Sequence, residues 1–509
     1  MLSKNKKDIL ILLIGTAFQF ITGMLSTRIV TSVLVPHEIG RMAIVMAIIL
    51  WFNFLTGPAS AYTQRNLLEW DLRGMVRKNI SYLFLYLSVV SVVGSIVLII
   101  MKHTIGIGIN IETYWIIMLV MGLVFTTGIN NGFMGWLNMF KKRIWYVFFS
   151  NLTTWLGICL SLLFVMFISM SAENWLLGQI LSHLLILFFS GIVFLKLLKP
   201  PQAFRARENG TSIEKPKSLL LVFNFGWPIS VASLILWFQQ SAYRFVLEKT
   251  SSLEVVGLFT VGFGLGMNLV DRFYSLFNQF YDPIFFKEIT TGDISKKTAA
   301  WNNYAYYLMP AALVMSIYII CGGPFIAKII VGEKFYHIAK NSIIWGVISQ
   351  LALIFYTAYS MVGMIQHNTK GYILPNIIGL IVMMCGLFSL SSWDPYLGAG
   401  ISLSAGSLAV FLVGRWTMVK LLPVKLPVKR LFFSFILTLP MIVFLGIIRS
   451  LYLTPSIIQS LVVLTLSGVY VVFIQFILVK KRMVLPKQLD FVDKIENKWE
   501  SYFLKNRCL

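Results

Sequence analysis

Long apolar runs separated by short polar breaks occupy most of the chain. A helix needs about 20 apolar residues to cross a bilayer, and fourteen runs approach or exceed that length. The pattern therefore predicts an all-α, polytopic membrane protein with about 14 transmembrane helices. The predicted spans are 9–35, 39–63, 80–101, 113–138, 144–170, 174–198, 219–247, 255–284, 299–320, 342–365, 372–390, 396–419, 431–448 and 456–479.

The composition agrees with this interpretation. Only 12% of the residues are charged and 58% are hydrophobic, with a mean hydropathy of +0.80, whereas soluble domains carry about 25% charged residues. The four cysteines have no paired spacing, which argues against a disulfide or metal framework. The apolar run after Asp8 is too long for the core of a signal peptide, so we expect a retained first helix.

Lysine and arginine are distributed unevenly between the loops. With the N-terminus in the cytoplasm, 32 of the 43 basic residues fall in cytoplasmic segments, 7 in outer segments and 4 within spans. This asymmetry follows the positive-inside rule and predicts that both termini are cytoplasmic. The net charge of +23 is then a topology signal and a contact surface for anionic membrane lipid, and we expect no nucleic acid partner.

Polar segments divide the chain into five predicted parts. They are an N-terminal six-helix bundle (1–198), a cytoplasmic linker (199–218), a second six-helix bundle (219–420), two additional transmembrane helices (421–480) and a basic, amphipathic cytoplasmic tail (481–509). The outer segment 324–340 is also amphipathic, and its pattern predicts a helix that lies along the membrane surface.

The segments that open the two bundles resemble each other. Residues 26–48 and 241–263 each carry an arginine near the outer end of a span (Arg28 and Arg244), a glutamate ten residues later and then a glycine. Both bundles begin inside, so the pattern predicts parallel repeats. Internal repeats with a site at their interface are a common plan in transporters.

The eighth span carries a polar face. Charge at the bilayer centre costs about 2.5–3.5 kcal/mol on insertion scales, so such residues usually face a cavity or a partner. Two interpretations fit this face, a water-filled lumen or a buried polar seam between helices, and we favour the lumen. Its members fall at steps of three and four residues: Asn268, Asp271, Arg272, Ser275, Asn278, Gln279 and Asp282.

Three polar residues of other spans are candidates for the same lumen. Gln240 and Arg244 share one face of the seventh span, although Arg244 lies near the outer end, where its side chain can also snorkel to the interface. Arg28 of the first span has the same alternatives, together with an ion pair. The glycine cluster at 262–266 predicts close helix packing.

Several kinds of chemistry are absent from the sequence. It contains no G-x-x-x-x-G-K-[ST] phosphate-binding loop and no H-E-x-x-H metal motif. The predicted segments between spans are all short, which leaves no room for a soluble catalytic domain. The sequence therefore predicts a protein that is not an enzyme, with no catalytic residue, no cofactor and no bound metal.

The order of several short motifs resembles a known family. Pro36-x-Glu38-x-Gly40 follows the first span, and Glu254-Val-Val-Gly257-Leu-Phe stands at the matching point of the second bundle. The segments IIVGEKFY (329–336), HNTK (367–370) and YLGAGI (396–401) follow. Across most of the chain they resemble the Wzx-type oligosaccharide flippases, polysaccharide transporters of the multidrug/oligosaccharidyl-lipid/polysaccharide (MOP) superfamily.

The resemblance implies a fold of two six-helix bundles arranged in a V, plus two C-terminal helices, in a bacterial cytoplasmic membrane. It implies movement of an undecaprenyl-pyrophosphate-linked oligosaccharide from the inner to the outer leaflet by alternating access. Coupling to H⁺ or Na⁺ is the usual proposal for such proteins. A polysaccharide polymerase and a chain-length regulator are the protein partners that the resemblance implies.

This cargo assigns roles to the lumen residues. Arginine can grip an anionic pyrophosphate in a bidentate manner, so Arg272 and Arg244 are the main candidates for that group, with Arg28 as a third. Gln240, Asn268 and Asn278 are candidates for hydrogen bonds to sugar hydroxyls, and Gln279 lies on the same face. Asp271 and Asp282 are candidates for ion coupling.

Rival functions are weighed against this one. A multidrug antiporter of the same superfamily typically has an acidic residue in its first span and only twelve spans, which disfavours it here. A flippase for a lipid II-type peptidoglycan precursor differs only in cargo and stays open. A membrane polysaccharide polymerase should have a long outer loop with catalytic residues, and a structural scaffold leaves the polar face of the eighth span unexplained.

Overall fold

Every regular element that the structure describes is helical. The structure is a computed structural model, and it describes residues 2–72, 74–105, 112–140, 142–197, 230–231, 233–290, 294–366, 370–452 and 454–480. The predicted linker (199–218) and the predicted tail (481–509) lie outside the described residues. The prediction of an all-helical membrane protein is confirmed for the described part of the chain.

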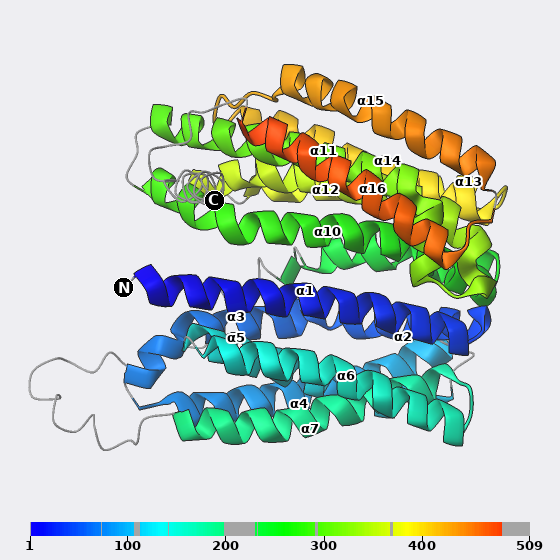
Figure 1. Ribbon diagram of the computed structural model, residues 1–509. Helices are drawn as coiled ribbons and strands as arrows, with labels where there is room; N and C mark the ends of the chain where they lie inside the picture. The colour runs from blue at the N-terminus through cyan, green and yellow to red at the C-terminus, as the bar shows by residue number, and fades with distance from the viewer. Residues whose placement is uncertain are drawn as a thin grey trace, which may run out of the picture.

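The first seven helices form one lobe, the N-lobe, which is the lower half of Figure 1. Within it α6 packs along both α1 and α7, and α5 packs along α4 and α7. The helices are α1 (Leu2–Val33), α2 (Pro36–Trp51), α3 (Asn53–Leu72), α4 (Val76–Ile105), α5 (Thr113–Met139), α6 (Arg143–Phe167) and α7 (Ala172–Leu197).

The following helices form a second lobe, the C-lobe, in the upper half of Figure 1. Here α12 packs against α10, α11 and α14, and α14 packs against α13. The elements are α9 (Tyr243–Thr250), α10 (Leu253–Thr290), α11 (Ile294–Ile330), α12 (Glu333–Ile365), the short 3₁₀ helix η2 (Lys370–Tyr372), α13 (Ile373–Leu390) and α14 (Pro395–Val419). A helical stretch at 233–241 leads into α9.

The last two helices, α15 (Val428–Leu451) and α16 (Ile457–Lys480), attach to the outside of the C-lobe along α11. Buried Arg430 at the start of α15 places its guanidinium 3.6 Å from the ring centre of Tyr306 in α11 and donates to the carbonyl oxygen of Leu478. Tyr318 of α11 donates to the Leu464 carbonyl of α16 at 2.9 Å. These contacts fasten both helices to α11.

Eleven helices in the described residues are long and apolar enough to cross a membrane, or up to twelve if the bent pair α2–α3 is one span. Parts of the predicted spans 9–35 and 219–247 fall on residues whose side chains or backbone are not described. The total of fourteen therefore stays a prediction, whereas a multi-pass membrane protein is supported directly.

The predicted second span is bent by 49° between α2 and α3. At the bend, the N–H groups of Phe52 and Leu55 bond to carbonyls three residues back, as in a tighter 3₁₀ turn. Pro58, one turn into α3, removes a further backbone donor. The apolar run 39–63 is continuous in sequence, so hydropathy alone does not show the bend.

One sequence prediction is wrong. The segment 324–340 does not lie along the membrane surface, because α11 continues to Ile330 and α12 begins at Glu333 after a short turn. Its apolar side chains, among them Phe325 and Phe335, are buried inside the C-lobe. Pro324 is accommodated within α11.

The glycines of α10 allow it to approach α12 closely. A Cβ on Gly266 would overlap the Ile343 carbonyl of α12, and one on Gly346 would overlap the Phe263 carbonyl of α10. Only a hydrogen side chain fits between backbones at this spacing, as in membrane helix pairs generally. The predicted packing role of the glycine cluster at 262–266 is thus confirmed for Gly262 and Gly266, whereas Gly264 faces open space.

Candidate functional site

We define the outer end as the end of the molecule where α1 meets α2, α6 meets α7, α9 meets α10 and α11 meets α12, at the right of Figure 1. The charge distribution predicts that this end faces away from the cytoplasm. The two lobes touch here. A Cβ on Gly40 of α2 would overlap the Leu253 carbonyl of α10, and one on Gly257 would overlap the Pro36 carbonyl.

The same face of α10 that touches the N-lobe at the outer end becomes polar and exposed farther along the helix. At 100° per residue, Asn268 and Ser275 project almost in line with Gly257. Asn268 and Arg272 are exposed, and Ser275 is half-buried. Because these side chains continue the face that meets α2, they lie on the side of α10 that is turned toward the N-lobe.

Asp271 is turned toward α12. Its Oδ1 accepts a hydrogen bond of 3.0 Å from Nε2 of Gln350, which is only 9% exposed. The neighbouring Arg272 is exposed. The two adjacent opposite charges therefore have different surroundings: the carboxylate is hydrogen-bonded inside the C-lobe, and the guanidinium is exposed.

Gln240 enters the same region from the helical stretch before α9. It is exposed and lines a small pocket of the C-lobe. Gln239, Met267, Ser349 and Ser407 also line this pocket. Since Met267 precedes Asn268 on α10, Gln240 lies beside the turn that carries Asn268.

Sequence reasoning missed three of the polar residues in that pocket. Ser349 and Ser407 share a hydrogen bond of 2.6 Å between α12 and α14, and Gln239 donates to the Asn376 carbonyl at 2.6 Å. Gln239 stands next to Gln240, which is a signal that the sequence offered. The hydrogen bond between Ser349 and Ser407 depends on how α12 packs on α14, so no local sequence pattern predicts it.

Arg244 reaches the N-lobe. Its Nη1 lies 3.5 Å from the carbonyl oxygen of Ala43 in α2, and its Nε lies 3.4 Å from the Tyr243 hydroxyl. One helical turn along α2, the indole N–H of Trp237 donates to the Ala47 carbonyl at 2.6 Å. Arg244 is half-buried and is one of the residues that join the two lobes at the outer end.

Arg28 lies apart from the polar face of α10. Its guanidinium donates to the carbonyls of Lys328, at 3.0 Å, and Val331, at the outer end of α11. It therefore contacts the backbone of the C-lobe instead of pointing along the polar face. The structure brings Gln240, Asn268 and Arg272 into one region and places Arg28 outside it.

The inner part of the polar face is described only in part. Asn278 is half-buried, and its Oδ1 accepts a hydrogen bond of 3.0 Å from the hydroxyl of Tyr304. The side chains of Gln279 and Asp282 lie outside the described residues, so their roles stay predictions. Beyond the span, burial raises the pKa of the Glu288 carboxyl above its ordinary value.

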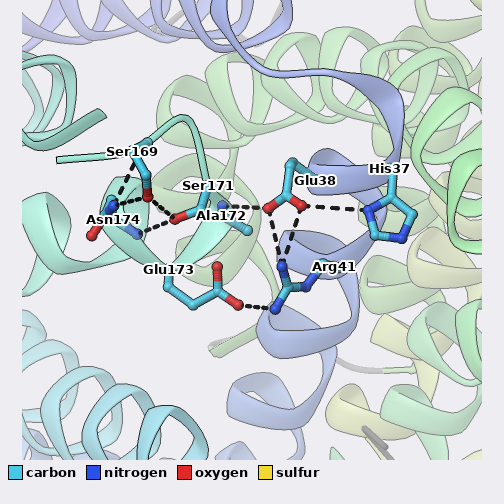
Figure 2. A network of polar contacts seen from close by, with 8 residues as sticks. All are labelled: His37, Glu38, Arg41, Ser169, Ser171, Ala172, Glu173 and Asn174. Carbon is cyan, nitrogen blue, oxygen red and sulfur yellow. Dashed lines mark hydrogen bonds and ion pairs between the residues drawn. The ribbon is translucent and has the colours of Figure 1, made fainter. Parts of the chain in front are cut away.

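A charged network ties the outer parts of the N-lobe together (Figure 2). Arg41 of α2 pairs with Glu38 at 3.2 Å and with Glu173 at the start of α7. Glu38 Oε2 accepts a hydrogen bond of 2.8 Å from the Ala172 N–H, a stabilising contact between a carboxylate and a helix N-terminus. The first turn of α2, which touches the C-lobe, is thereby fixed to the α6–α7 loop.

Comparisons with known proteins place this architecture. No family model matches the chain, and no curated protein sequence matches it. A solved structure of the lipid II flippase MurJ, in an inward closed conformation, matches with a TM-score of 0.62 and 14% identity over 92% of this chain and 98% of that chain. A MATE family multidrug resistance transporter of the MOP superfamily, in an inward-facing conformation, matches with a TM-score of 0.59 and 14% identity over 79% of this chain and 95% of that chain.

The chain has the fold of MOP superfamily transporters. An outward-facing MATE family structure matches less well, with a TM-score of 0.50 and 15% identity over 81% of this chain and 94% of that chain. The contacts between the lobes at Gly40, Gly257 and Arg244 lie at the outer end. In the described residues, the polar face of α10 runs from the contact between the lobes at Gly257 toward the opposite end of the helix.

Proposed function

We propose that this protein is a flippase of the bacterial cytoplasmic membrane, with both termini in the cytoplasm. It moves undecaprenyl-pyrophosphate-linked oligosaccharide units, the precursors of surface polysaccharide, from the inner to the outer leaflet by alternating access. The MOP fold supports a transporter of this kind, and the motif resemblance to Wzx-type flippases supports the cargo.

The observation that carries the proposal is the exposed Arg272 on the face of α10 between the lobes. A pyrophosphate linkage is anionic, and a guanidinium binds such a group through two parallel hydrogen bonds. The attraction between the guanidinium and the anion is stronger in a site shielded by low-dielectric helices than in bulk water. The amides of Asn268 and Gln240 are neutral donors and acceptors, which suit the hydroxyl groups of a sugar.

Ion coupling is proposed for Asp271. Its carboxylate is half-buried and accepts from Gln350 while standing next to the cargo-binding Arg272. A proton or Na⁺ on this carboxylate would remove its attraction for Arg272 and so change how strongly the guanidinium holds an anion. We propose Asp282 as a second coupling residue on its predicted position alone.

A lipid II-type precursor is the second candidate cargo. The observation in its favour is the match to MurJ, which covers 92% of this chain, whereas the MATE structures cover 79% and 81%. Both candidate cargoes contain a polyprenyl diphosphate, so the same arginine suits either. Multidrug extrusion is disfavoured because the first span has a basic residue, Arg28, and no acidic residue after Asp8.

Deletion of the gene followed by lipid analysis separates these functions. Loss of surface polysaccharide, with accumulation of lipid-linked oligosaccharide on the inner leaflet, is the expected result. Defective peptidoglycan with normal polysaccharide would instead favour the lipid II-type cargo. Unchanged lipids with altered drug resistance would overturn the flippase proposal.

A matched pair of variants tests the site. Arg272→Gln is expected to abolish polysaccharide export while leaving membrane insertion normal. Arg415→Gln removes another exposed arginine of the C-lobe, on α14, and is expected to leave export near the wild-type level. Full export by the Arg272→Gln protein would exclude that residue as the diphosphate ligand.

A further inference from the structure

Arg28 makes a helix-capping contact between the two lobes. The last carbonyl groups of a helix have no partner within the helix, and α11 ends at Ile330. The guanidinium of Arg28, in α1, donates to the carbonyls of Lys328 and Val331 at this end. A cation at a helix C-terminus is favoured both by these hydrogen bonds and by the helix dipole.

Thr31, one turn farther along α1, bonds to Gly332, the residue that follows Val331 in the C-lobe. Its Oγ1 accepts a hydrogen bond of 2.8 Å from the N–H of Gly332, in the turn between α11 and α12. Thr31 is 1% exposed. A Cβ on Gly332 would overlap the carbonyl of Thr31, so this turn rests directly on the backbone of α1.

The arrangement joins parts that separate when the outer face opens. In the MOP fold α1 belongs to one lobe, and α11 and α12 belong to the other. The side chains of Arg28 and Thr31 bond to backbone groups of the C-lobe, so these bonds form only while the two lobes are in contact. When the lobes part, those groups and the guanidinium can exchange their bonds for bonds to water entering from outside, so the net cost of opening is moderate.

We propose that Arg28 and Thr31 form a latch, which holds the outer face closed and must release before cargo can leave on that side. Arg28 thus acts on the ratio between closed and open states of the outer face and does not bind the diphosphate. The inference assumes that the outer face opens during a transport cycle, but it does not depend on which cargo is carried.

The rate at which an outer-face cysteine becomes labelled tests the latch without any cargo. The four native cysteines are first replaced, and Ala43→Cys is introduced on α2, where the side chain is 7% exposed between the lobes. Cells are then treated with a membrane-impermeant maleimide from outside. If opening is rapid and rare, the labelling rate is proportional to the open fraction.

Arg28→Gln is expected to raise this rate at least tenfold, which corresponds to about 1.4 kcal/mol. Arg415→Gln is the control, because it removes an exposed intramembrane arginine of the C-lobe, and its rate is expected to match the parent. Thr31→Val keeps the shape of the side chain and removes the acceptor for the Gly332 N–H, so a smaller increase is expected.

Equal labelling of the Arg28→Gln and parent proteins would overturn the latch. If Arg28→Gln does not accumulate in the membrane, the Thr31→Val protein decides the matter by the same comparison, and a parental rate there would also overturn it. The two proposals can fail separately. Normal polysaccharide in the gene-deletion strain would overturn the flippase proposal, whereas faster labelling of the Arg28→Gln protein would still support the latch.

Discussion

The contact between Gly257 and Pro36 predicts how a single methyl group changes the balance between the closed and open states of the outer face. A Cβ at Gly257 would lie closer than 3.0 Å to the carbonyl oxygen of Pro36 and to the backbone nitrogen of Gly40. Cβ atoms essentially never approach other atoms so closely. These neighbours are backbone atoms, so no side chain can swing aside, and the lobes themselves must move apart.

The cost of Gly257→Ala therefore falls on the closed outer face and not on the folding of either lobe. Overpacking of a fitted contact costs about 1–3 kcal/mol, which corresponds to a 5- to 150-fold shift toward the open outer face. Gly264→Ala is a matched control on the same helix, since nothing lies within 4 Å of its added Cβ. The control gains about 0.5–1 kcal/mol of helix stability from replacing glycine.

The outside labelling rate of Ala43→Cys measures this shift directly. The Gly257→Ala protein is expected to react 5- to 150-fold faster than the parent, and the Gly264→Ala protein at the parental rate. Equal rates for the two alanine variants would refute the reasoning, because they would show that the lobes do not meet at Gly257 in the membrane.

Three further substitutions test separate contacts. Gln350→Leu deprives the Asp271 carboxylate of its amide donor, at a cost of about 1–3 kcal/mol, and is expected to reduce export in the lipid-accumulation assay without loss of protein from the membrane. Arg430→Leu removes the ring contact of α15 with Tyr306 of α11 and the hydrogen bond of α15 to the Leu478 carbonyl of α16, worth about 1.5–3 kcal/mol for a charged donor, and should lower the thermal midpoint of the purified protein; an unchanged midpoint would contradict that role. Arg41→Gln should destabilise the N-lobe by leaving the Glu173 carboxylate unpaired, and adding Glu173→Gln should restore part of the loss in a double-mutant cycle.

Hydropathy and charge predicted most of the fold because a bilayer imposes strong constraints on sequence. Spans must be apolar and helical, so each of the described helices α4 to α7 and α10 to α16 contains most of a predicted run, although α11 and α12 extend into 324–340. The bend at Phe52 was not predictable from hydropathy, because 39–63 is apolar enough on average to be counted as one span. The segment 324–340 was misinterpreted because amphipathicity does not tell a membrane surface from a protein core.

The candidate site was predictable where its signal lay within one helix. The spacing of Asn268, Arg272 and Asn278 gave their shared face directly, since helical periodicity is a local property. Arg28 and Arg244 were ambiguous for a physical reason: their partners are backbone carbonyls of the other lobe, and a carbonyl leaves no mark in the sequence. The same applies to Gln350, whose importance follows only from the packing of α12 on α10.

The attachment of α15 and α16 to α11 makes the two lobes unequal in width. If the lobes rock against each other, α15 and α16 move with the C-lobe. The C-lobe then displaces more lipid than the N-lobe does. Viscous drag and lateral pressure in the bilayer would then act mainly on the C-lobe, and we expect membrane thickness and fluidity to affect the rate of this motion. A fluorophore on the lipid-facing side of α16 would report the tilt of the C-lobe from a position far from the cargo.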